Sequence, residues 1–143
     1  MRVALVTAAF RARSPIDLAS HVRSLAPALA RAGASVEIFA GVTGSGLVPY
    51  AQRRSELVEP VTGQAFGVTV VELEDRPDQA RAAEAFASFL ERERPQVCHF
   101  ESLDPMGVGL VREAKVRRIS TLYSAQDTWP AHDRVTLTMP DMS

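Results

Sequence analysis

The chain has 143 residues, a length that suggests one domain with its own hydrophobic core. Hydrophobic residues make up 46% and charged residues 23%, values typical of a soluble globular protein. The net charge of -1 gives no electrostatic reason to expect nucleic acid or an anionic membrane as a partner. No apolar run approaches the roughly 20 residues of a membrane span, and no signal peptide is evident, so we expect no membrane span and a cytoplasmic location.

The N-terminal third alternates between apolar strands and an amphipathic helix. The continuous apolar run 2–8 predicts a strand buried on both faces. Asp17 is the expected N-cap of a helix that ends at Gly33, with Pro27 inside it to kink it or remove one hydrogen bond. Residues 35–40 predict the second strand. The apolar positions of the helix share one face: Leu18, Val22, Leu25, Leu29 and Ala32.

The stretch 41–67 is rich in glycine and proline, and we interpret it as a long loop in which 51–58 could form a short helix. The regular alternation of predicted strands and helices then resumes. The expected elements are a strand over 68–73, a helix from about 78 to 94 ended by Pro95, a strand over 96–100, a helix opened by Asp104-Pro105 and running to about 116, and a strand over 119–124.

This order predicts an α/β fold, a Rossmann-like doubly wound and mostly parallel sheet with helices on both faces, as a single domain over 1–143. The strands at 2–8, 96–100 and 119–124 should be parallel neighbours, with the first one interior. Ligands bind such sheets at the carboxyl ends of the strands, where the strand order reverses. The polar segment "YSAQDTWPAHDR", 123–134, comes after the last strand and should lie at that edge.

Several segments resemble the start of retaining glycosyltransferases of family four, which have the GT-B fold. The segments "MRVALVTAAF" and "SHVRSLAPALARAGASVEIFA" carry the likeness at the N-terminus. Further on, "RPQVCHFESL" is similar to that family's "RPDVVHFHS" and "YSAQDTWP" to its "YTLHDYWP". The segment "RVTLTMPD" is similar to the family's next segment along the chain. The resemblance covers nearly the whole chain except the 41–67 stretch.

The resemblance implies the N-terminal, acceptor-side domain of a two-domain enzyme, and we expect this chain to be a truncated form of that domain. The implied reaction moves a sugar from a nucleotide-sugar donor to a hydroxyl acceptor with retention. The donor would be bound through a missing C-terminal domain, so the isolated chain is expected to be inactive. A homodimer through an apolar face left uncovered by truncation is also expected. The alternative is a non-catalytic glycosyltransferase-like binding or interaction module.

Three positions differ from the resembled family. Ile16-Asp17 stand where that family often has Gly-Gly near the donor diphosphate, which a β-branched side chain and a carboxylate would crowd and repel. Glu101 stands at a family histidine. Gln126 stands at the histidine before Asp-Tyr-Trp, and Gln can hydrogen-bond a hydroxyl but carries no proton near neutral pH.

The predicted substrate-binding residues are Gln126, Asp127, Glu101, Ile16, Asp17 and Trp129. Asp127 could instead cap a turn, and Trp129 is interpreted as a plug of the core edge rather than a platform for a sugar ring. Glu101 could be an acid or base if buried, or a carboxylate favoured by the next helix N-terminus.

The remaining reactive side chains have ordinary interpretations. His99 is predicted to be a satisfied core histidine and Cys98 a buried inert thiol. Arg11 and Arg13 could meet phosphate but are more simply exposed. His21, His132 and Arg134 are expected to be solvated. The spacing of His, Cys, Asp and Glu predicts no metal site. We expect no cofactor, and the sequence leaves the catalytic residues unknown.

Overall fold

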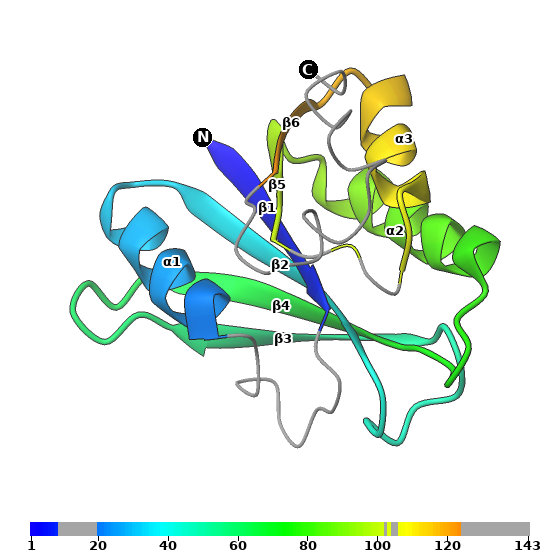
Figure 1. Ribbon diagram of the computed structural model, residues 1–143. Helices are drawn as coiled ribbons and strands as arrows, with labels where there is room; N and C mark the ends of the chain where they lie inside the picture. Colours follow the sequence, from blue (N-terminus) through cyan, green and yellow to red (C-terminus); the bar gives the residue numbers. More distant parts are fainter. Residues whose placement is uncertain (9–19, 102, 104–105, 124–143) are drawn as a thin grey trace.

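The computed structural model describes residues 1–8, 20–101, 103 and 106–123. Within them the chain forms strands and helices in alternation (Figure 1). The strands are β1 (Arg2–Ala8), β2 (Ser35–Val42), β3 (Gln52–Val58), β4 (Ala65–Glu72), β5 (Val97–Phe100) and β6 (Ser120–Tyr123). The helices are α1 (Ser20–Arg31), α2 (Gln79–Glu93) and α3 (Gly109–Val116).

The strands form one sheet in the order β3-β4-β2-β1-β5-β6. Every neighbouring pair is parallel except β3 and β4, which are antiparallel. The predicted α/β class with a mostly parallel sheet is therefore confirmed. So is the expectation that β1, β5 and β6 are parallel neighbours with β1 interior. The order reverses between β1 and β5, because β2 and β4 extend the sheet on one side of β1 and β5 and β6 on the other.

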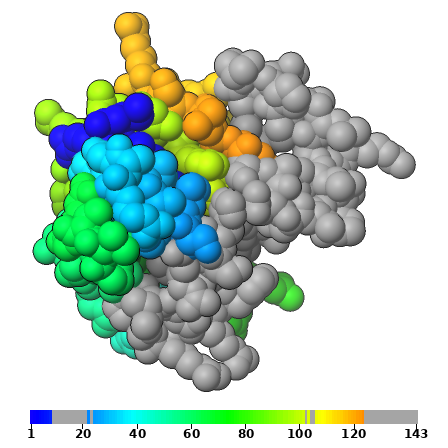
Figure 2. Space-filling view, turned by 90° about the vertical axis from the view of Figure 1, so that its left-hand side faces the viewer, coloured from blue at the N-terminus to red at the C-terminus, as the bar shows by residue number. Residues whose placement is uncertain are grey.

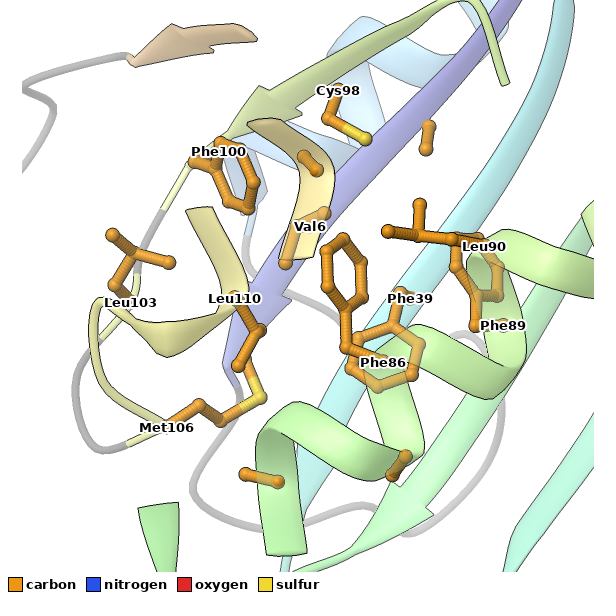
Figure 3. Close-up of a cluster of buried hydrophobic side chains, with 14 of the residues drawn as sticks. Val6, Phe39, Phe86, Phe89, Leu90, Cys98, Phe100, Leu103, Met106 and Leu110 are labelled. Atoms are coloured by element: carbon orange, nitrogen blue, oxygen red, sulfur yellow. The ribbon is translucent and has the colours of Figure 1, made fainter. Parts of the chain in front are cut away.

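Helices cover both faces of the sheet, with α1 on one side and α2 and α3 on the other (Figure 1). The larger core lies beneath α2 and α3 (Figure 3). Its centre is aromatic: the ring centroids of Phe39 and Phe86 lie 5.0 Å apart, and those of Phe86 and Phe100 5.9 Å apart. Cys98 is buried in this core, as predicted, among these apolar side chains.

The second core lies under α1. Val22, Ala26 and Ala30 are buried at helical spacing against β1, β2 and β4. The turn between β3 and β4 lies against α1 on the face shown in Figure 2. There Arg31 Nη1 lies 2.8 Å from Oε1 of the buried Glu59. This ion pair fixes the turn to the end of the helix.

The 41–67 stretch differs from the expected loop. Residues 52–58 form strand β3 rather than a short helix, and β4 starts at Ala65. Gln52 and Arg54 make contacts outside their own strand: Gln52 Nε2 donates to Ala85 O of α2 over 2.9 Å. Arg54 donates to Glu37 of β2 over 2.7 Å. The strand pairs with β4, which follows directly in the chain, but residues 51–58 are mostly polar, so their composition did not reveal it.

Helix α3 starts later than expected. The prediction placed its first turn at Asp104-Pro105, two residues that lie outside the described part of the chain, whereas the helix begins at Gly109. Gly107 has a φ of 91°, a conformation that a right-handed helix cannot contain. By contrast, α2 begins and ends as predicted. Asp78 accepts hydrogen bonds from the backbone N–H groups of Ala80 and Arg81.

Candidate functional site

The reversal of strand order places a candidate site at the carboxyl ends of β1 and β5. Open α/β sheets bind ligands at this position because the connections from the two strands run to opposite faces and leave a crevice. Thr7 lies at the end of β1, and Glu101 directly follows β5. Leu5 pairs with His99 and Val6 with Phe100. The next register position therefore brings Thr7 beside Glu101.

Glu101 is the buried carboxylate of this edge, only 4% exposed. Its backbone N–H donates to Val6 O over 2.8 Å, which continues the ladder between β5 and β1 by one residue. Its side-chain Oε1 lies 3.1 Å from His99 Nε2. His99 and Glu101 are two residues apart on an extended segment, so their side chains lie on the same face. The pairing holds the two side chains together on this face of the sheet.

His99 has a side-chain partner, as expected of a satisfied histidine, but it is only partly buried. Cys98 and Phe100 face the core beneath α2 and α3, whereas His99 faces the other side and its side chain is 22% exposed. Its nearest charged partner is Glu101. The alternation along the strand correctly predicted that His99 faces the side opposite Cys98. The contact of His99 with Glu101, two residues further along the chain, could not be predicted from this alternation.

Thr7 is the polar residue that sequence reasoning missed. Within β1, Val3 and Leu5 belong to the core under α1, so Thr7 also faces that side of the sheet. It is fully buried, and its hydroxyl has no hydrogen-bond partner in the described part of the chain. The only signal in the sequence was a polar residue at the end of an otherwise apolar strand.

Together, Thr7, His99 and Glu101 can bind hydroxyl groups. A carboxylate accepts hydrogen bonds from O–H donors, and a threonine hydroxyl both donates and accepts. The buried carboxylate of Glu101 would repel a phosphate. This arrangement therefore suits a neutral, hydroxyl-bearing ligand.

Five of the predicted substrate-binding residues lie outside the described part of the chain. These are Ile16, Asp17, Gln126, Asp127 and Trp129. Their roles stay predictions. Glu101 lies in the described part and is buried, which is the condition under which it could act as an acid or base, and its role stays a prediction as well.

A second polar cluster lies at the carboxyl end of β4. The carboxylate of Glu72 accepts hydrogen bonds from the backbone N–H groups of Gly44 and Ser45, over 3.1 and 2.9 Å, and from Ser45 Oγ. Burial by itself would raise the pKa of Glu72, but the hydrogen bonds from Ser45 and Gly44 outweigh it and hold the pKa below its ordinary value. These bonds fix the loop that follows β2, so we assign this cluster a structural role.

The described residues do not support a reactive thiol or a metal site. Burial raises the pKa of Cys98 to about 12, which leaves almost no thiolate at neutral pH. Among residues 1–8, 20–101, 103 and 106–123, no group of three or more His, Cys, Asp or Glu side chains could hold a metal ion. In that same part of the chain, no helix is long and apolar enough to cross a membrane.

Comparison with known proteins identifies the family. The glycosyl transferase 4-like domain matches residues 18–140, which is most of the chain. The chain belongs to this family. No curated protein matches it significantly. The family match supports a glycosyltransferase-type function in general terms.

Proposed function

We propose that this chain is the acceptor-binding domain of a glycosyltransferase that moves a sugar from a nucleotide-sugar donor to a hydroxyl acceptor with retention. The observation that carries the proposal is the buried carboxylate of Glu101 at the carboxyl end of β5, next to β1. The family match over residues 18–140 supports the reaction class.

The charge of the site favours the acceptor over the donor. A nucleotide sugar carries a diphosphate, and a buried carboxylate would repel it strongly because the protein interior screens charge poorly. A hydroxyl group, in contrast, can donate a hydrogen bond to Glu101, and bonds to charged groups are the stronger ones. Stabilisation of the leaving diphosphate must then come from a separate donor-binding domain.

The test is titration of the isolated chain, followed by chemical-shift changes. Methyl α-glucopyranoside serves as the neutral hydroxyl probe and UDP-glucose as the nucleotide-sugar probe. We expect weak, saturable binding of the glucoside, with Kd in the millimolar range or thereabouts, and little binding of UDP-glucose. Glu101→Gln should weaken glucoside binding by about tenfold, the effect of losing one charge-assisted hydrogen bond.

Glu91→Gln is the matched control, because Glu91 is an exposed carboxylate of α2 that pairs with Arg117 over 2.9 Å. It should leave glucoside binding unchanged. Tight UDP-glucose binding, or sugar transfer by the isolated chain, would contradict the proposal. Glucoside binding without transfer, even after a donor-binding domain is supplied, would favour the non-catalytic binding module instead.

A further inference from the structure

The hydroxyl of Thr7 is buried without a hydrogen-bond partner in the described part of the chain. A buried polar group that makes no hydrogen bond lowers stability, because it loses its bonds to water and gains nothing in return. Valine has nearly the same shape and would avoid this loss. A threonine at this position is therefore costly for the fold alone, and a bound ligand would satisfy the hydroxyl.

Thr69 provides the comparison within the same sheet. It is also fully buried on a strand, but its Oγ1 accepts a hydrogen bond from Arg92 Nη2 over 3.0 Å. The hydroxyl of Thr69 thus has a structural partner, whereas the described residues offer none to the hydroxyl of Thr7. The difference between the two threonines points to a ligand at Thr7 rather than to a general preference for threonine in this sheet.

The surroundings of Thr7 indicate what that ligand is. The strand register places Thr7 next to Glu101, and neighbouring strands lie about 4.8 Å apart, so one small group can reach both side chains. His99 Nε2, 3.1 Å from Glu101 Oε1, holds the carboxylate in place. The carboxylate only accepts hydrogen bonds, whereas the hydroxyl can both donate and accept.

We propose that Thr7 and Glu101 form a two-point site for a vicinal diol of a neutral sugar or polyol acceptor, with His99 as a positioning residue. One hydroxyl of the diol donates to Glu101, and the oxygen of the next hydroxyl accepts from Thr7. The buried carboxylate excludes acceptors that carry phosphate near the diol. This inference rests on the proposed function and specifies the acceptor class of the same site.

The experiment compares Thr7→Val with Thr69→Val in the full chain. Methyl α-glucopyranoside and glucose 6-phosphate are the probes, binding is read from chemical shifts, and stability is measured by urea unfolding. We expect Thr7→Val to weaken glucoside binding by about three- to tenfold, the effect of one neutral hydrogen bond, while its unfolding midpoint stays equal or rises. Thr69→Val should have the opposite profile, with a lower midpoint and unchanged binding.

Thr7→Ser keeps the hydroxyl and should keep most of the binding, which separates the role of the hydroxyl from that of the side-chain shape. Glucose 6-phosphate should bind more weakly than the glucoside. If the wild-type chain binds the glucoside but Thr7→Val binds it equally well, the Thr7 site is wrong and the proposed function survives. Preference for the phosphorylated sugar, or loss of stability in Thr7→Val, also overturns the inference. If the wild-type chain binds neither probe, both proposals fall.

Discussion

At the scale of single residues, Gly67 shows how a missing side chain makes room for a charge pair. Gly67 lies in β4 opposite Glu37 of β2. A Cβ at this position would overlap the carboxylate of Glu37 and press on the guanidinium of Arg54. These two groups are 2.7 Å apart. Burial raises the pKa of Glu37, and its pairing with Arg54 works against that rise. Glycine is therefore required by space rather than by backbone conformation.

We expect Gly67→Ala to lower the free energy of unfolding by about 1–3 kcal/mol, because the new methyl group must displace the Glu37–Arg54 pair. Gly109→Ala is the control. Its Cβ would meet only Ala83 Cβ at 3.4 Å, and alanine is favoured over glycine in a helix by up to about 1 kcal/mol. Urea unfolding of the two variants measures both values. Equal effects in the two variants would show that the space at Gly67 does not matter.

At the scale of elements, the carboxylate at the end of β4 helps to hold the loop after β2. Glu72 accepts from the backbone of Gly44 and Ser45 and from the hydroxyl of Ser45, and these bonds hold its pKa below the ordinary value of 4.5. A carboxyl group whose pKa is lower in the folded state contributes stability above its unfolded pKa. That contribution is lost as the pH falls through the folded pKa.

We therefore expect Glu72→Gln to destabilise the chain by about 1 kcal/mol at neutral pH and to flatten the fall in stability below pH 4.5, because the amide does not titrate. Ser45→Ala should have part of this effect, since it removes one of the hydrogen bonds that lower the folded pKa of Glu72. Its acid-induced loss of stability should therefore be smaller than in the wild type and should end at a higher pH. Urea unfolding across the acid range checks this. Parallel pH curves for Glu72→Gln and the wild type would refute the assigned role of Glu72.

The elements that the sequence predicted well were those whose evidence is local. The apolar runs of β1 and β2 could be predicted because burial on both faces leaves a continuous apolar pattern, and the end of α2 because Pro95 cannot continue a helix. Strand β3 could not, since its residues are mostly polar and it pairs along one edge only, with β4, in the described sheet, so no apolar run marks it. Helix α3 starts late because Gly107 has a positive φ. The pair Asp104-Pro105 is typical of a helix start and therefore led to the prediction of an earlier first turn.

The candidate site was predictable only in part for the same reason. Glu101 was found because it follows a buried strand, and a polar residue there marks the carboxyl edge of the sheet. Thr7 and His99 were not, because their importance comes from the register between β1 and β5 and from a contact across two residues. Both depend on the folded structure rather than on sequence spacing.

At the scale of the whole molecule, the two edges of the described sheet differ. Strand β3 forms one edge and carries the exposed charged residues Arg53, Arg54 and Glu56, which discourage pairing with another chain. Strand β6 forms the other edge and has only four residues. On β6, Leu122 is 58% exposed. Leu122 is the exposed apolar side chain of this edge in the described part of the chain, so it is where we place the expected homodimer contact.

We therefore expect the chain to form a homodimer through the β6 edge as its concentration rises, with the same patch on both copies. Leu122→Lys should shift the chain to monomer, because a charge at the centre of that contact must be desolvated on association. Val61→Lys is the control: Val61 is 77% exposed but lies in the turn between β3 and β4, away from β6. Sedimentation velocity over a wide concentration range measures the shift. A wild-type chain that stays monomeric throughout, or an equal shift in both variants, would rule out this dimer.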